Sequence, residues 1–336
     1  MSDPTPRPAP RLSILDLAIV GDGETAADAF SNSVALARRA EERDYARVWY
    51  AEHHNMASIA SSATSVLIAH VAARTSTIRL GAGGIMLPNH APLTIAEQFG
   101  TLATLHPDRI DLGLGRAPGS DRTTMRALRR DERSSDRFPD DVRELQGYLA
   151  GESTVPGVVA VPGAGTRVPI YILGSSLFGA QLAASFGLPY AFASHFAPGA
   201  LLDAVAAYRR HFRPSAQLES PYVIAGVNVI AAETDEAAHE QFAIVRRRRL
   251  ARFLTPGRTL TDEEADAVLE SPQGRQIAQM MHYSAVGTPE LCATYLREFA
   301  HHAGVDEVIT AHASPTIEER LASVDLLADA LRPVPA

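Results

Sequence analysis

Residues 81–119 have the sequence GAGGIMLPNHAPLTIAEQFGTLATLHPDRIDLGLGRAPG and contain a complete strand–loop–helix–strand succession. A buried strand is predicted to end at the glycines of residues 81–84, and two prolines mark the loop after it. Apolar residues at helical spacing in residues 93–103 predict an amphipathic helix. The alternation at residues 110–114 predicts a second short strand, which brings Arg116 to its carboxyl end.

Glycine-rich backbone and a guanidinium therefore lie at two consecutive strand ends. In folds of alternating strands and helices, ligands bind at this edge of the sheet. Glycine allows a flat ligand to approach the main chain, and the Arg116 guanidinium can donate two parallel hydrogen bonds to a phosphate or carboxylate. The glycines at residues 81–84 also suit close packing between strands, and the two explanations are compatible.

The rest of the chain continues the alternation of strands and helices. Further strands are predicted at Leu12–Leu17, Arg47–Ala51, Pro169–Leu173, Pro189–Ser194, Tyr222–Ala231 and Glu307–Ala311, which makes eight in all. An open doubly wound sheet would also alternate. The count of eight, with polar or glycine-rich residues at nearly every strand end, favours a (β/α)8 TIM barrel.

The domain organisation follows from the same pattern. Residues 1–11 are rich in proline and predict a disordered N-terminal arm, whereas residues 12–336 predict a single barrel domain with insertions. Glycine, proline and valine in short alternation at residues 151–168 predict a surface hairpin. Residues at about 253–285 have mixed polarity without clean periodicity, which indicates an insertion.

Composition restricts the class of protein. Hydrophobic content of 46% and charged content of 21% are typical of a globular protein with a substantial core. The net charge of −8 argues against a nucleic-acid binder. No apolar stretch is long enough for a membrane span, and the N-terminal residues lack the apolar region of a signal peptide. A cytoplasmic enzyme is therefore expected.

The single cysteine and a run of arginines have ordinary explanations. Cys292 has no second cysteine to pair with, which excludes an internal disulfide and a cysteine metal cluster. It lies in an amphipathic pattern and is expected to be a small buried apolar residue. The run Arg246–Arg249 is expected to be a solvated helix face rather than a site for a polyanion.

Glu52-His53-His54 follow the second predicted strand, at the rim where barrel enzymes carry their chemistry. Either the histidines only hydrogen-bond neighbouring loops, or one faces the barrel mouth and acts on a bound intermediate. Adjacent residues on an extended chain point to opposite sides, so His53 and His54 would not readily share one metal ion.

Gly174-Ser175-Ser176 begin a predicted helix and could hold an anion. Free backbone N–H groups, two hydroxyls and the helix dipole all favour a phosphate there, although plain N-capping would also explain the serines. In a barrel, Arg116 ends the neighbouring strand and would stand near the same helix start. This coincidence favours the phosphate site.

These residues resemble the bacterial luciferase-like flavin-dependent monooxygenase family. The matching stretches, in order, are AEHHN (51–55), GAGGIMLPNHAP (81–92), AEQFGTLATLHPDRIDLGLGRAPG (96–119), YILGSS to GLP (171–189) and VGTPE (286–290). The resemblance covers nearly the whole chain. The long run at residues 81–119 is its most specific part.

The resemblance implies a (β/α)8 barrel that binds reduced FMN (FMNH2), supplied by a separate NAD(P)H:flavin reductase. Oxygen adds to the flavin C4a atom, and the peroxide attacks a small organic substrate such as an aldehyde or ketone. The family also suggests a homodimer, and it places a mobile lid where this chain has residues at about 253–285.

The resemblance also implies roles for individual residues. His53 matches the histidine that assists the peroxide chemistry. Gly83 and Gly84 match a non-proline cis peptide beneath the isoalloxazine ring, and Arg116 matches the arginine that binds the phosphate. Arg137 corresponds to a second phosphate arginine, although the loop before it differs in length.

Ser175 and Ser176 match the helix start that holds the phosphate, but this chain departs from the family around them. Light-emitting members carry a cysteine where this chain has Gly115, a Glu-Ser pair where it has the two serines, and a threonine where it has Gly179. Flavin binding is expected to persist, with backbone N–H groups replacing side chains. The departures argue against light emission and a long-chain aldehyde substrate.

Two alternatives stay open. A deazaflavin F420-dependent oxidoreductase could use the same barrel and transfer hydride without oxygen; the match of residues 81–119 to FMN-using members ranks it second. A non-catalytic flavin-binding subunit is the other alternative, and the presence of His53 argues against it.

Overall fold

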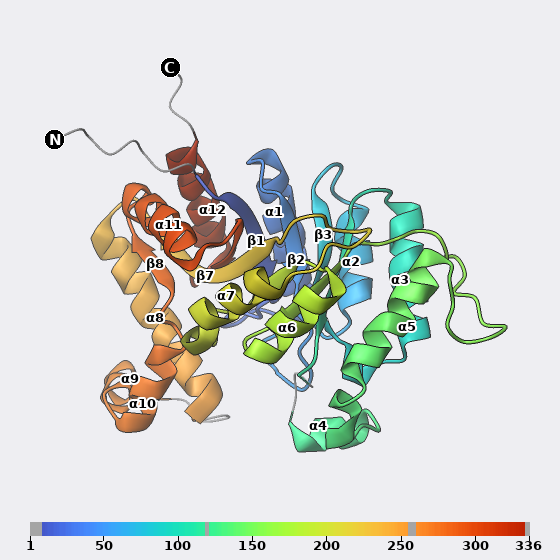
Figure 1. Cartoon of the computed structure of the whole chain (residues 1–336). Helices are drawn as coiled ribbons and strands as arrows, with labels where there is room; N and C mark the ends of the chain where they lie inside the picture. The colour runs from blue at the N-terminus through green and yellow to red at the C-terminus, as the bar shows by residue number, and fades with distance from the viewer. Residues whose placement is uncertain (1–8, 118–120, 255–259, 333–336) are drawn as a thin grey trace.

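Eight parallel strands close into a barrel in the computed structural model, which describes residues 9–117, 121–254 and 260–332 (Figure 1). The order around the barrel is β1-β2-β3-β4-β5-β6-β7-β9, and β9 returns to β1. The strands are β1 (Arg11–Asp16), β2 (Arg47–Tyr50), β3 (Arg79–Met86), β4 (Ile110–Gly115), β5 (Ile170–Gly174), β6 (Tyr190–Phe192), β7 (Val223–Ala231), β8 (Ser284–Gly287) and β9 (Glu307–His312). The prediction of a (β/α)8 barrel is confirmed.

Helices surround the barrel because each carries an apolar face that the outside of the strands can bury. The outer layer is α1 (Ala26–Glu42), α2 (Thr64–Ala72), α3 (Pro92–Leu105), α5 (Phe138–Ala150), α6 (Leu177–Phe186), α7 (Leu201–His211), α11 (Pro289–Ala303) and α12 (Ile317–Leu331). The further helices are η1 (Leu87–Asn89), α4 (Arg122–Ala127), η2 (Glu132–Ser135), η3 (Pro198–Ala200), α8 (Asp235–Leu254), α9 (Asp262–Leu269) and α10 (Pro272–Gln279).

The glycine run lies inside a strand, not at its end. β3 continues through the glycines to Met86, with a register shift against β4 between Ala82 and Ile85. The prediction that the strand stops at residues 81–84 was therefore wrong. The peptide bond between Gly83 and Gly84 is cis, as the family resemblance implied for this bond.

A ninth strand was missed in the sequence. β8 has four residues and pairs only with the last four residues of β7, so it carries no periodicity of its own. It includes Ser284 and Ala285, the end of the expected insertion at about 253–285. The rest of that insertion forms the end of α8, α9 and α10, while residues 255–259 lie outside the described residues.

Two other boundaries need correction. Residues 151–168 form turns without a strand, so no hairpin is present there. Arg11, assigned to the N-terminal arm, already belongs to β1 and pairs with Glu307 of β9. Residues 1–8 of that arm lie outside the described residues. Cys292 is buried in the main core, as expected, and no helix among the described residues is long and apolar enough to cross a membrane.

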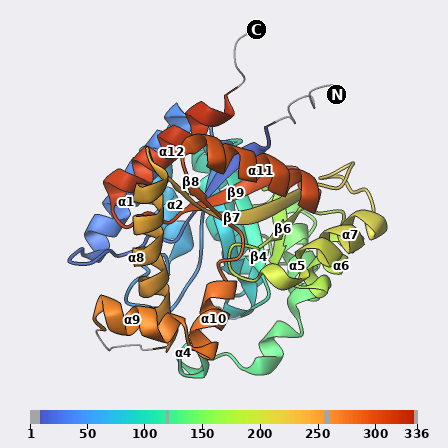
Figure 2. The same ribbon diagram turned by 90° about the vertical axis from the view of Figure 1, so that its left-hand side faces the viewer.

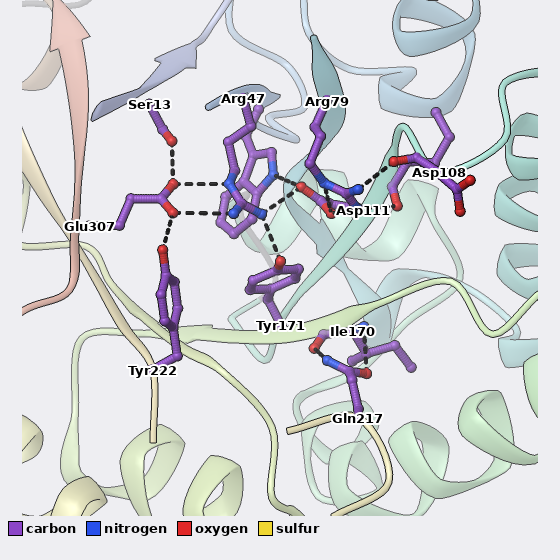
Figure 3. A network of polar contacts seen from close by, with 12 residues as sticks. Ser13, Arg47, Arg79, Asp108, Asp111, Ile170, Tyr171, Gln217, Tyr222 and Glu307 are labelled. Carbon is purple, nitrogen blue, oxygen red and sulfur yellow. Dashed lines mark hydrogen bonds and ion pairs between the residues drawn. The ribbon is translucent and has the colours of Figure 1, made fainter. Parts of the chain in front are cut away.

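A layer of buried ionic side chains fills the amino end of the barrel (Figure 3). The Arg47 guanidinium lies between the Asp111 and Glu307 carboxylates, at 2.8 and 2.9 Å. Tyr171 and Tyr222 add hydrogen bonds of 2.6 Å to this layer. Satisfied charges can be buried without a large penalty. Because they saturate one another here, ligand chemistry is expected at the opposite, carboxyl end.

Candidate functional site

The carboxyl ends of the strands form a mouth beneath several short helices. Figures 1 and 2 place α4, α9 and α10 on the side of the molecule opposite α12, and α4 follows directly after β4. A hydrogen bond of 3.2 Å from Asn55 to Asp121 joins the segments that follow β2 and β4. Loops from separate strands therefore meet at this mouth, where barrel enzymes bind their ligands.

The glycines of β3 and β4 are required by close packing. A Cβ atom on Gly83 would lie 2.9 Å from the Cβ of Trp49, inside the barrel. A Cβ atom on Gly84 would lie 2.7 Å from the Gly113 carbonyl oxygen, and one on Gly113 would lie 2.2 Å from the Ala82 carbonyl oxygen. Packing thus accounts for these glycines. Their role beneath a flavin ring stays a prediction.

Arg116 and the start of α6 lie together. The Arg116 guanidinium carbon is 4.2 Å from the centroid of the Phe178 ring, and Phe178 is the second residue of α6. Ser176 is the N-cap residue of α6, but no side chain caps the helix. Ser175 and Ser176 are exposed. Plain N-capping, the alternative explanation for the serines, is therefore absent, and the first turn is open to an anion.

Gly179 has a packing role at the same helix start. It is buried, and a Cβ atom there would lie 3.4 Å from the Tyr190 ring and 3.7 Å from the Cα of Gly174. The Tyr190 hydroxyl donates a hydrogen bond of 3.1 Å to the Ser176 carbonyl oxygen. The small residue lets β5 and β6 approach the helix, and it offers only backbone to a ligand.

Arg137 stands apart from this arrangement. Its side chain is largely exposed and pairs with Asp141 at 3.3 Å, one turn along α5. Among the described residues, it makes no hydrogen bond or ion pair with Arg116 or α6. The structure therefore adds no support for Arg137 as a second phosphate ligand.

Glu52 organises the segment that carries the two predicted histidines. The buried Glu52 carboxylate accepts hydrogen bonds from the Met86 backbone N–H at 3.0 Å, from His54 at 2.8 Å and from His90 at 3.0 Å. Burial alone would raise the pKa of this carboxyl, but the hydrogen bonds outweigh it and lower the pKa to about 2. Glu52 is thus a fixed anion, and its hydrogen bond raises the pKa of His54.

The His53 side chain has no hydrogen-bond partner at one ring nitrogen. Its Nδ1 atom is buried and makes no hydrogen bond among the described residues. Burial and the charge of Arg252 lower the pKa of His53, against the opposing effect of Glu52. His53 is therefore a neutral imidazole at neutral pH.

His195, Arg249 and Arg252 were missed in the sequence. His195 follows β6 and interacts electrostatically with both His53 and Arg249, and burial together with these charges lowers its pKa to about 4. Burial and the charge of Arg252 lower the pKa of Arg249 to about 10. The expectation that Arg246–Arg249 is a solvated face was wrong for Arg249. In the sequence, the available signal was that Arg249 and Arg252 are three residues apart on one helix, which puts them on the same face.

Position along the chain could also have pointed to His195. It is the third residue after β6, at the same rim as His53, which is the third residue after β2. A Cβ atom on Gly226 of β7 would lie 2.1 Å from the His195 Nδ1 atom. The ring therefore lies directly against a glycine inside the barrel.

The sequence is similar to those of known proteins. The family described as luciferase-like monooxygenase matches residues 11–307. A luciferase-like monooxygenase of Escherichia coli (strain K12) is 47% identical over 94% of this chain and 96% of the relative. The N-acetyl-S-alkylcysteine monooxygenase of Bacillus subtilis (strain 168) is 34% identical over 96% of this chain and 98% of the relative.

Solved structures share the fold. Apo-MsnO8 is 35% identical, with a TM-score of 0.87 over 97% of this chain and 100% of that chain. Two structures below 25% identity share the fold alone. The oxygenating constituent of 3,6-diketocamphane monooxygenase from Pseudomonas putida, in complex with FMN, has a TM-score of 0.70 and 15% identity over 96% and 98% of the two chains. An F420-dependent secondary alcohol dehydrogenase has a TM-score of 0.71 and 14% identity over 97% and 100%. From the family match across most of its length, this chain belongs to the luciferase-like monooxygenase family.

Proposed function

We propose that this chain is a flavin-dependent monooxygenase that uses FMNH2 and O2 to oxygenate a small organic substrate such as an aldehyde or ketone. The observation that carries the proposal is the junction of Arg116 with the uncapped start of α6. A guanidinium and free backbone N–H groups at one helix end suit a dianionic phosphate. The cis Gly83–Gly84 peptide lies on β3, the neighbour of β4, and Arg116 is the first residue after β4.

These residues fit reduced FMN. Arg116 and the first turn of α6 would hold its phosphate, and the side-chain-free backbone at Gly83 and Gly84 would lie against its ring. Bound FMNH2 would supply the electrons that activate O2. His53 would hold or transfer a proton at its buried Nδ1 atom, because its lowered pKa keeps the imidazole neutral.

We also propose that FMNH2 comes from a separate NAD(P)H:flavin reductase and that the chain is a homodimer. Both proposals rest on the family resemblance of the sequence. Sedimentation velocity measures the oligomeric state, and a single species at the mass of one chain would contradict the dimer.

Oxygen uptake tests the proposed function directly. The protein is mixed with FMNH2 without oxygen, and 18O2 is then admitted with a panel of aldehydes, ketones, aromatic compounds and thioethers. Thioethers are included because the related B. subtilis protein is named an N-acetyl-S-alkylcysteine monooxygenase. We expect one 18O atom in a product of at least one compound. Products without 18O, or release of H2O2 alone, would contradict monooxygenation.

A second arm separates the F420 alternative. Reduced F420 is mixed with the ketones, or oxidised F420 with the matching alcohols, in the absence of oxygen. Turnover in this arm, with no 18O incorporation in the first, would establish hydride transfer and overturn the proposal. Tight FMN binding without either activity would favour a non-catalytic flavin-binding subunit.

A further inference from the structure

Four basic side chains from three segments of the chain form a cluster at the barrel mouth. We call His53, His195, Arg249 and Arg252 the basic cluster. Electrostatic interactions link His53 to Arg252, Arg252 to Arg249, Arg249 to His195, and His195 to His53. Each member therefore lies near two others, and the two arginines carry the positive charge.

The barrel geometry explains why these residues meet. In the closed order of strands, β2 and β6 are separated by three strands on either side, so they lie opposite each other. His53 follows β2 and His195 follows β6, so their interaction spans the mouth. α8 brings the two arginines to the same place. Arg248 fixes this helix to the mouth loops through Asp22 at 2.8 Å and the Pro315 carbonyl oxygen at 3.0 Å.

The basic cluster is partly buried, and four of its polar atoms are unsatisfied. The Nδ1 atoms of both histidines, the Nη1 of Arg249 and the Nε of Arg252 are shielded from solvent and make no hydrogen bond within the described residues. Buried polar groups are normally paired, because an unpaired one costs the free energy of its lost hydration. The two guanidinium nitrogens can only donate, so together they indicate a missing acceptor, and each histidine can donate to it from the Nδ1–H tautomer.

No carboxylate of the described chain supplies that acceptor. Glu52, the acid that acts on His53, is already engaged by His54, His90 and the Met86 N–H.

The same helix provides the contrast. Arg247, on its outer face, pairs with Asp262 and Asp266, both at 2.6 Å. Arg248 pairs with Asp22. The outward arginines of α8 thus have carboxylate partners in the fold, whereas Arg249 and Arg252 make no ion pair with any described residue. A solvated helix face would not explain why Arg247 and Arg248 have carboxylate partners while Arg249 and Arg252 have none among the described residues.

We propose that the basic cluster binds an oxyanion, the carboxylate of the substrate. This rests on the proposed function, in which the flavin phosphate lies at Arg116 and α6, beyond β4 and β5. The cluster is built from the other loops of the mouth and is free for a second anion. Phe196 and Phe253 flank it in sequence, and their partly exposed rings lie 6.2 Å apart. The substrate is therefore a carboxylate with an apolar body.

Binding of matched ligand pairs tests the proposal without any turnover. The probes are hexanoate, phenylacetate and 3-(methylthio)propanoate, each titrated beside its neutral amide by calorimetry. In the wild type we expect at least one carboxylate to bind about tenfold more tightly than its amide, as expected for one charge-assisted interaction. An absence of preference in all three pairs would overturn the proposal.

Variants then assign the preference to the basic cluster. Arg249→Gln and Arg252→Gln should abolish it, while Arg247→Gln on the outer face of α8 should retain it. A variant that loses Arg249 should be as heat-stable as the wild type or more so, because one of two neighbouring arginine charges without an ion-pair partner is removed. The proposal would be contradicted if Arg247→Gln lost the preference for carboxylates, or if both Arg249→Gln and Arg252→Gln retained it. If neither Arg249→Gln nor Arg252→Gln folds, the binding of carboxylates compared with their amides in the wild type still tests the proposal.

Flavin titrations separate the two sources of an oxyanion. Arg249→Gln should leave the ratio of FMN to riboflavin affinity unchanged. If it lowers FMN affinity selectively, the cluster holds the flavin phosphate and the proposal is wrong. A chain that binds carboxylates but shows no oxygenation with FMNH2 would contradict the proposed function alone.

Discussion

The guanidinium of Arg116 lies over the ring of Phe178, 4.2 Å from its centroid. One residue follows β4 and the other lies in the first turn of α6, so this contact joins the ends of two consecutive β/α units. A cation over an aromatic face is held in place without losing its hydrogen-bond donors. Arg116 is therefore positioned for an anion at the start of α6.

Replacement of Arg116 should discriminate between flavins. Arg116→Gln is expected to weaken FMN binding by about tenfold or more, since a charge-assisted bond to phosphate is lost. Riboflavin, which lacks the phosphate, should bind almost as before. Fluorescence titration of both flavins measures the effect. Arg137→Gln is the control, because Arg137 already pairs with Asp141, and an equal loss in that variant would show that the phosphate also contacts Arg137.

His53 is expected to matter for turnover and not for flavin binding. His53→Ala should retain FMN affinity while the rate of 18O incorporation falls by about 10²–10⁴-fold, the usual effect of losing a proton-transfer group. Rapid-mix oxygen uptake with the best compound of the panel gives the rate. The exposed His70 of α2 provides a control as His70→Ala. Unchanged turnover in His53→Ala would refute the proposed role.

The glycines of β3 and β4 should be intolerant of even one methyl group. In Gly113→Ala, the new Cβ would lie 2.2 Å from the Ala82 carbonyl oxygen on the neighbouring strand, so the strands must separate. We expect a loss of about 1–3 kcal/mol or more in the free energy of unfolding, measured by urea denaturation. Gly199→Ala has no atom within 4 Å of the new Cβ, and equal loss in both variants would contradict the packing argument.

Glu52 should make stability depend on acid pH. The pKa of its carboxyl is about 2 in the folded chain against a reference value of 4.5, so the unfolded chain binds more protons between these values. The stabilisation is therefore complete above 4.5 and is lost as the pH falls towards 2. Between about pH 6 and about pH 3.5, Glu52→Gln should lose about 1 kcal/mol less stability than the wild type. Parallel curves from urea unfolding would show that Glu52 has an ordinary pKa.

Cys292 should be unreactive until the chain unfolds. Burial and the charge of Asp235 raise the pKa of its thiol to about 12, and the Sγ atom lies 3.7 Å from the carbonyl oxygens of Ile230 and Gly287. Because the thiolate is the reactive species, a disulfide reagent should label the native protein at a negligible rate. Labelling in urea at the same pH is the positive control. Rapid labelling of the native chain would contradict the buried position.

Several elements could be predicted because their signals are local. Seven of the eight predicted strands needed boundary changes of only one or two residues. The eighth, β3, continues through its glycines. The bounds of β3 were misjudged because glycine ends most strands, whereas here it allows the approach of Trp49 and β4. β8 escaped because a strand of four residues has no periodicity to detect.

Sequence alone determined the barrel, the family and the position of His53 at the rim. Through the family resemblance, it also predicted the cis peptide between Gly83 and Gly84. Each of these depends on residues that are neighbours in the chain or on spacings along it. The tertiary structure decided which charges meet. His53 and His195 are 142 positions apart in the numbering, yet strand closure sets them across one mouth, where they share electrostatic contact with two arginines of α8. Coulomb forces and burial depend on distance in space, and no local pattern encodes that distance.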